Sequence, residues 1–120
     1  MKCNIQATGF ELTPAIKDYA TSKLASTTKF LGKVNQGTIT CSVELERTTS
    51  HHTKGEIYRA EVNMSVEGVM HRSETSSTDL YAAIDLLRDE LARKIKSEKG
   101  KSESIFKRGA RAVKSILKSN

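Results

Sequence analysis

The sequence has no tryptophan, a single proline and two cysteines, and only 5% of its residues are aromatic. Phe10, Phe30 and Phe106 are scattered off the expected strands, so there is no row of aromatic rings on which unstacked bases could bind. No apolar run approaches the roughly 18 residues of a membrane-spanning helix, and no signal-peptide core is present. We therefore expect a cytoplasmic protein that is neither secreted nor inserted in a membrane.

The two cysteines favour a reducing compartment. Cys3 and Cys41 occupy apolar positions of alternating segments, where a thiol packs like a small hydrophobic side chain. A disulfide between them would need neighbouring strands in suitable geometry, and the sequence leaves that open. A chain of 120 residues can bury a core without disulfides or metal, so we expect one domain with at most a short appendage.

Residues that often bind metals or perform catalysis are dispersed. His51 and His52 are adjacent in a polar segment without a third ligand at metal spacing, and His71 is alone on a short expected strand. The glycines form no phosphate-binding loop. We predict no catalytic residue, no metal site, no cofactor and no small-molecule substrate, and hence a protein that is not an enzyme.

Carboxylates on the expected strands could suggest acid–base chemistry. They alternate with apolar residues and therefore lie on the exposed sheet face: Glu44, Glu46, Glu61 and Glu67. Because Arg59 is on the same face, we interpret them as partners in cross-strand salt pairs.

Alternating apolar residues predict four strands, over about 1–8, 39–46, 58–67 and 69–74, with Gly68 turning the last two into a hairpin. Thr13 and Pro14 are typical of a helix start, and this helix runs to about Leu31 before Gly32. A second helix is predicted over 78–99, after N-cap candidates Ser76 to Thr78 and the favourable charge of Asp79. Its apolar stripe comprises Leu80, Ile84, Leu87, Leu91 and Ile95.

The element order predicts an α+β fold, βαβββα, with a four-stranded mixed sheet and two helices packed on one face. The crossover through the first helix makes the first two strands parallel, and the other pairs are antiparallel. Gly100 and the polar residues after it indicate a hinge, so we assign residues 1–100 to the domain and 101–120 to a tail.

Positive charge is concentrated at the C-terminal end. The formal net charge is +6, yet residues 88–120 carry 11 basic and 4 acidic side chains. Basic residues gathered on one element gain affinity for polyanions by releasing condensed counterions, so nucleic acid is the first candidate partner. An anionic membrane surface and a merely solvated helix face are the alternatives.

The tail is itself amphipathic. Its apolar residues recur at helical spacing, namely Ile105, Phe106, Ala110, Val113, Ile116 and Leu117. The candidate contact residues of the tail are basic: Lys107, Arg108, Arg111, Lys114 and Lys118. The basic face could bind RNA, and the apolar face could dock on the domain, on another protein or on a membrane.

The run from Asp79 to Asp85, DLYAAID, continues through Leu91-Ala92-Arg93-Lys94. With Asn4-Ile5 and Leu12-Thr13-Pro14-Ala15-Ile16, it resembles the family of ribosome hibernation promoting factors and ribosome-associated translation inhibitors, over about residues 1–100. The resemblance implies a non-enzymatic factor that binds the small ribosomal subunit and its rRNA. Such a factor occupies the tRNA and mRNA channel and silences idle ribosomes. Some family members end in an acidic tail or add a dimerising domain, and residues 101–120 resemble neither.

The resemblance also indicates which residues bind RNA. Lys23, Arg93 and Lys94 match basic positions of the family, and Lys96 and Lys99 lie in the same stretch. Arg88 stands where members often carry an apolar or other residue. At 100° per residue, one flank of the second helix carries Tyr81, Arg88, Lys96 and Lys99, with Arg93 on the outer face. The predicted RNA-binding set is Lys23, Tyr81, Arg88, Arg93, Lys94, Lys96 and Lys99.

A second function fits the same residues. A βαβββα body with basic helices also resembles the double-stranded RNA-binding module, which reads A-form backbone by shape and phosphate contacts, although that module lacks the first strand. A general structured-RNA binding module is therefore the alternative to a ribosome-bound translation inhibitor. The sequence allows partial packing of Tyr81 as readily as an RNA contact.

Overall fold

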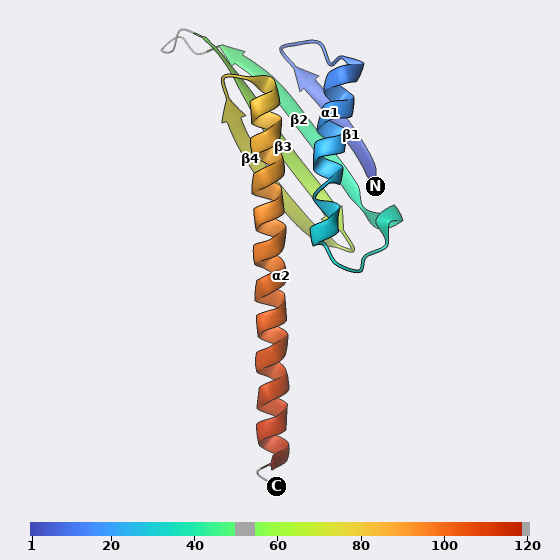
Figure 1. Ribbon diagram of the computed structural model, residues 1–120, viewed down its shortest axis with the longest axis vertical. Coiled ribbons are helices and arrows are strands. Elements are labelled where there is room, and N and C mark those ends of the chain that lie inside the picture. Colours follow the sequence, from blue (N-terminus) through green and yellow to red (C-terminus); the bar gives the residue numbers. More distant parts are fainter. Residues whose placement is uncertain (50–54, 119–120) are drawn as a thin grey trace.

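The computed structural model describes the backbone of residues 1–49 and 55–118 and the side chains of residues 1–49 and 55–99 (Figure 1). Its elements are β1 (Lys2–Thr8), α1 (Pro14–Ala25), the 3-10 turns η1 (Thr28–Phe30) and η2 (Gln36–Thr38), β2 (Thr40–Thr49), β3 (Glu56–Val66), β4 (Val69–Ser77) and α2 (Leu80–Lys118). This order confirms the predicted βαβββα fold and adds the two short turns. His51 and His52 lie outside the described residues.

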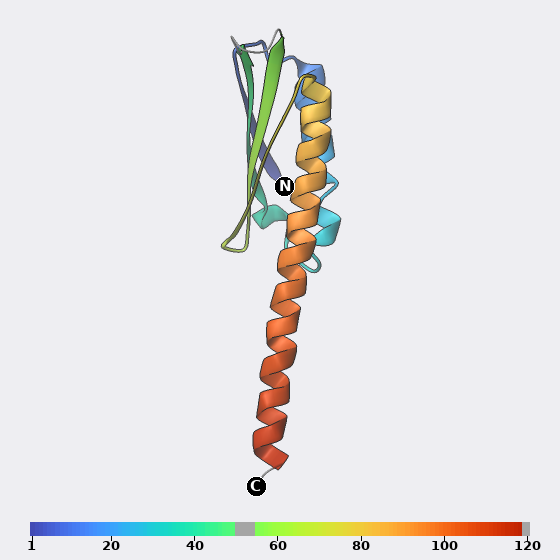
Figure 2. The same cartoon turned by 90° about the vertical axis from the view of Figure 1, so that its left-hand side faces the viewer.

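The four strands form one mixed sheet in the order β1-β2-β3-β4. β1 and β2 are parallel, with Cys3 opposite Cys41, and the other two pairs are antiparallel. Both helices lie on the same face of the sheet, as the edge-on view shows (Figure 2). The predicted topology is therefore confirmed.

The hydrophobic core fills the space between this face and the helices. From β2 and β3 come predicted inward residues that include Val43, Leu45, Val62 and Met64, and Ile39 lies just before β2; all are buried. From α2 comes the whole predicted stripe, Leu80, Ile84, Leu87, Leu91 and Ile95, also buried. Burial of one stripe on one sheet face is what orients the opposite flank of each helix toward solvent.

Helix α1 ends at Ala25, six residues before the end that its apolar pattern predicts. The hydroxyls of Ser26, Thr27 and Thr28 donate to the carbonyls of Lys23, Leu24 and Ala25, at 2.5, 2.7 and 2.9 Å. These side chains satisfy the last carbonyls of the helix locally, so the helical ladder need not continue. The chain turns through η1 instead.

Helix α2 begins later and ends later than predicted. The Asp79 carboxylate accepts a hydrogen bond from the Ala82 amide at 2.9 Å, so Asp79 caps the helix rather than Ser76, Ser77 or Thr78. The predicted break at Gly100 is wrong, because the helix is continuous to Lys118. The segment after Gly100 has no proline, and the two interior glycines, Gly100 and Gly109, cost only about 1 kcal/mol each. The helix therefore runs well past the end of the sheet (Figures 1 and 2).

The hairpin between β3 and β4 also differs from the prediction at its turn. β3 ends at Val66, and Glu67 lies in the turn with a φ of 48°, not on the outer face of the strand. Gly68 follows with a φ of 83°, and β4 then extends to Ser77, beyond the predicted end at residue 74. A left-handed residue beside glycine is typical of tight two-residue hairpin turns.

Gly9 and Gly68 provide a matched test of backbone packing. Both have positive φ, 85° and 83°. A Cβ at Gly9 would lie 2.6 Å from the Arg47 carbonyl oxygen, whereas one at Gly68 would meet nothing within 4 Å. We expect Gly9→Ala to lower the free energy of unfolding by about 2–4 kcal/mol and Gly68→Ala by about 1 kcal/mol in urea titrations. Equal losses would contradict the close approach of the β1–α1 turn to β2.

Candidate nucleic-acid interface

Helices α1 and α2 lie side by side, and their facing flanks form a defined contact (Figure 1). The rings of Tyr19 and Tyr81 meet edge to face, with centroids 4.8 Å apart. The Tyr19 hydroxyl donates to Asp85 at 2.5 Å, and Arg88 Nε donates to Ser26 Oγ at 3.0 Å. These contacts hold the helices in one relative position, so side chains along their junction have a fixed arrangement.

Phe30 is the centre of a group of cations at this junction. Lys96 Nζ lies 4.1 Å, Lys29 Nζ 5.1 Å and the Arg88 guanidinium carbon 5.7 Å from the centroid of its ring. All three distances are within the range of cation–π attraction. An aromatic ring beside several cations partly offsets their mutual repulsion, but it supplies no negative charge that would neutralise them.

Lys23 and Lys99 extend this group in the two directions along the helices. Lys23 Nζ lies 3.3 Å from Asp85 Oδ1, one turn before Arg88. A Cβ atom added at Gly32 would lie 3.3 Å from Lys99 Nζ. The side chain of Lys99 therefore passes closely over the turn that follows η1. We call the set Lys23, Lys29, Arg88, Lys96 and Lys99 the cationic seam.

The members of the cationic seam differ in how far they are neutralised. Lys23 pairs with Asp85, and Arg88 lies 3.3 Å from Asp89. Among the described side chains, Lys29, Lys96 and Lys99 form no ion pair. All three are exposed. Their charge is thus available to an external anion at little cost in broken contacts.

Asp85 also favours the protonated forms of its two neighbours. Its hydrogen bond and negative charge raise the pKa of Lys23, and its hydrogen bond with the Tyr19 hydroxyl raises the pKa of that tyrosine. Lys23 therefore remains a cation and Tyr19 remains a neutral hydrogen-bond donor throughout the neutral range.

The remaining predicted RNA-binding residues of the domain lie elsewhere on α2. Arg93, on the outer face, is paired with Glu90 at 2.7 Å, which lowers the pKa of Glu90. Lys94 points to the other side, where its Nζ donates to the Arg72 carbonyl of β4 at 2.8 Å. The structure thus brings Lys23, Arg88, Lys96 and Lys99 together with Tyr81 and separates Arg93 and Lys94 from them.

Tyr81 is 42% exposed although its ring packs on Tyr19. The tail residues Lys107, Arg108, Arg111, Lys114 and Lys118 lie outside the described side chains.

The seam residue Lys29 and the Phe30 ring beside the seam were not predicted from sequence. The apolar period places both inside a longer first helix, with no reason to face α2. The sequence does contain a signal for the earlier helix end, the Ser26-Thr27-Thr28 run. Consecutive hydroxyl side chains compete with backbone amides for the carbonyls of the helix and so can end it.

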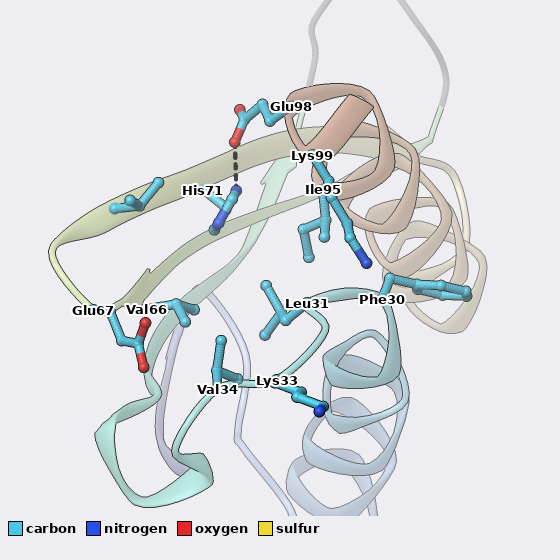
Figure 3. Close-up of a pocket in the computed structure, with 11 residues that line it drawn as sticks. Phe30, Leu31, Lys33, Val34, Val66, Glu67, His71, Ile95, Glu98 and Lys99 are labelled. Carbon is cyan, nitrogen blue, oxygen red and sulfur yellow. Dashed lines mark ion pairs between the residues drawn. The ribbon is translucent and has the colours of Figure 1, made fainter. Parts of the chain in front are cut away.

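A cavity of about 410 Å³ opens beside the seam, between η1, the β3–β4 hairpin and α2 (Figure 3). Leu31, Val34 and Ile95 form apolar walls, while Lys33 and Lys99 contribute cations. The buried His71 is not isolated as its sequence position suggests, because its Nδ1 lies 2.6 Å from Glu98 Oε2. This pair joins β4 to α2 near the point where the helix leaves the sheet.

The described residues contain no group of three metal-ligating side chains. On the outer face of the sheet, Arg59 contacts Glu46, Glu61 and Glu74 at 3.6, 3.1 and 2.5 Å. Arg72 adds a contact to Glu61 at 3.0 Å. The interpretation of these carboxylates as cross-strand salt pairs is confirmed for Glu46 and Glu61. No described helix is long and apolar enough to cross a membrane.

Comparison with known proteins places this geometry in a family. Residues 3–103 match the family described as Sigma 54 modulation protein / S30EA ribosomal protein. A ribosome hibernation promoting factor from Klebsiella oxytoca is 34% identical over 101 residues, covering 84% of this chain and 96% of that protein. A ribosome hibernation promotion factor from Picosynechococcus is 31% identical over 103 residues, and this chain spans 51% of its length.

Solved structures agree with the sequence relatives. The N-terminal domain of Thermus thermophilus Protein Y superposes with a TM-score of 0.67 at 28% identity, covering 81% of this chain and 98% of that domain. The family match includes β1 from Cys3, the other three strands, α1, and α2 as far as Glu103, with the DLYAAID run. The chain therefore belongs to the Sigma 54 modulation protein / S30EA ribosomal protein family.

Proposed function

We propose that this protein is a non-enzymatic ribosome hibernation factor that acts in the cytoplasm. In this proposal it binds the rRNA of the small ribosomal subunit, occupies the channel of tRNA and mRNA, and silences and protects idle ribosomes. The names of its relatives support the hibernation function. The cationic seam supports the mode of binding.

The seam carries the proposal because it is preorganised for phosphate. Lys29 and Lys96 gather around the ring of Phe30 without an acidic partner among the described side chains, so an RNA phosphate would replace repulsion with attraction. The helix contacts that fix the seam also remove much of the entropy cost of assembling it. We propose Arg93, Lys94 and the basic residues of the tail as additional contacts on either side.

Binding in the channel predicts inhibition by competition. Added to a purified translation system, the protein is expected to inhibit stoichiometrically with ribosomes, and the inhibition is expected to weaken when initiator tRNA and mRNA bind first. The physical reason is that two ligands cannot occupy one channel. The measurement is peptide synthesis as a function of the ratio of protein to ribosomes, in both orders of addition.

Inhibition at far below one copy per ribosome, or turnover of an RNA or nucleotide, would contradict this mechanism. Sedimentation of a lysate separates the proposal from the alternative of a general structured-RNA binding module. Migration with small subunits or whole ribosomes supports the hibernation factor. Distribution over bulk RNA in proportion to its amount supports the general module.

We also propose that residues 101–120 are separable from the domain. Among the described side chains of α2, Ile95 is the last that is buried, so a chain that ends at Lys99 retains every described core contact. We expect this shorter chain to keep its cooperative melt, within a few degrees, and to bind ribosomes more weakly, because it loses six basic side chains and one acidic side chain.

Thermal melts and ribosome-binding titrations of the 120-residue chain and of the chain that ends at Lys99 test whether the tail is separable. A fall of more than a few degrees in Tm would mean that the tail packs on the domain, through apolar residues such as Ile105 or Val113. Unchanged affinity at low and moderate salt would mean that the tail makes no contact with RNA.

A further inference from the structure

The two cysteines of the chain lie opposite each other in the sheet. Cys3 on β1 and Cys41 on β2 are register partners in the parallel pair. Neighbouring strands are about 4.8 Å apart, which is within the range of about 4.4–6.8 Å between the Cα atoms of disulfide-bonded cysteines. Both side chains are on the helix-covered face, where Cys41 belongs to the core and Cys3 packs against it. The pair therefore satisfies the positional requirements of a disulfide, although both thiols are free.

The surroundings of the two thiols differ. Cys41 is 3% exposed, whereas Cys3 is only partly buried, because β1 is an edge strand. Three groups favour the thiolate of Cys3: the Cys41 thiol and the Thr21 hydroxyl, which donate hydrogen bonds to it, and the charge of Lys17 on α1. Against the effect of burial, they lower the pKa of Cys3 to about 7. The same contact with Cys3 raises the pKa of Cys41, so Cys41 remains a thiol.

We propose that Cys3 and Cys41 form a dithiol that hydroperoxides oxidise, with Cys3 attacked first and Cys41 as the resolving thiol that closes a disulfide between β1 and β2. A reachable thiolate beside a second thiol is the arrangement that such chemistry needs. Nothing in the ribosome-binding proposal requires this pair, because the cysteines lie under α1 and not in the cationic seam.

The reaction balances in two steps. The Cys3 thiolate attacks one oxygen of the peroxide, the O–O bond breaks, and after proton uptake the products are a sulfenic acid and one water, or an alcohol from an organic hydroperoxide. Cys41 sulfur then attacks the sulfenic sulfur, the S–O bond breaks, and its proton leaves with the hydroxyl as a second water. The two thiols together lose two electrons and two protons. A dithiol reductant returns the pair to its starting state by exchange.

Treatment of the reduced 120-residue protein with equimolar hydrogen peroxide tests the proposal. We expect loss of two hydrogens in the intact mass and a Cys3–Cys41 peptide after non-reducing digestion. We also expect a Tm several degrees higher that returns on reduction, since the bond closes a long loop and ties down an edge strand. The Cys3→Ser/Cys41→Ser double variant controls for methionine oxidation and is expected to show none of these changes.

Single variants assign the roles. Cys41→Ser is expected to accumulate a sulfenic acid at Cys3 that dimedone traps, whereas Cys3→Ser is expected to keep its buried thiol until the protein is unfolded.

Wild-type Cys3 carries more than tenfold more thiolate at pH 7 than a cysteine of ordinary pKa, so its alkylation by iodoacetamide is expected to be half-maximal near pH 7. Lys17→Gln moves this midpoint upward, and Lys33→Gln, a lysine away from the pair, leaves it in place.

Three results would overturn the proposal. One is alkylation of Cys3 in the folded protein no faster than in the unfolded chain at pH 7. Another is oxidation only to dimers linked through Cys3. The third is rapid loss of the Cys41 thiol in folded Cys3→Ser, which would show that Cys41 does not depend on Cys3.

Discussion

Replacing Lys29, Lys96 and Lys99 of the cationic seam with glutamine is expected to weaken binding to small ribosomal subunits by about a hundredfold at moderate salt, taking each lost phosphate contact as about 1 kcal/mol. The three side chains are exposed, and none forms an ion pair within the described residues, so the fold is expected to persist. Each lost contact should also reduce the slope of log affinity against log salt by about one. Binding titrations at several salt concentrations measure both quantities.

A matched variant separates the position of the charges from their number. Changing Lys2, Arg47 and Arg72 to glutamine removes the same positive charge from exposed positions on the strands. If the seam is the RNA-binding surface, this control variant loses far less affinity and keeps most of the salt slope. Equal losses in the two triple variants would mean that net charge, and not the seam, determines binding.

The second large effect is expected in the core. Leu91→Ala removes a fully buried side chain from the stripe of α2, which packs on the sheet. Such a deletion costs about 2–5 kcal/mol, a large part of the total stability of about 5–15 kcal/mol for a domain of this size. We expect a fall in Tm of roughly 10–20 °C by calorimetry or circular dichroism.

Leu86→Ala is the matched control for this prediction. It makes the same chemical change in the same helix, so the change in helix propensity cancels, but Leu86 is 48% exposed. We expect it to cost less than about 1 kcal/mol. A comparable fall in Tm for the two variants would show that packing of α2 on the sheet does not stabilise the fold as described.

Helix ends were predicted less well than helix faces, and local hydrogen bonds explain the difference. The apolar pattern of the first helix continues to Leu31, but the hydroxyls of Ser26, Thr27 and Thr28 end it at Ala25. In α2 the opposite occurs, because Gly100 and Gly109 do not outweigh the helix-forming residues around them. Apolar periodicity records which face is buried over many residues, whereas a helix end depends on a few competing contacts worth about 1 kcal/mol each.

The sequence by itself determined the fold of this protein and the side of each element that is buried, because alternation and helical spacing leave one apolar face per strand and one stripe per helix. It also placed Lys96, Lys99 and Arg88 on one flank of α2. Only the tertiary structure decided that Lys23, Lys29 and Phe30 meet that flank, that Lys94 points to β4, and that Cys3 lies opposite Cys41. These contacts join segments far apart in the chain, and their geometry depends on how the helices and strands pack together.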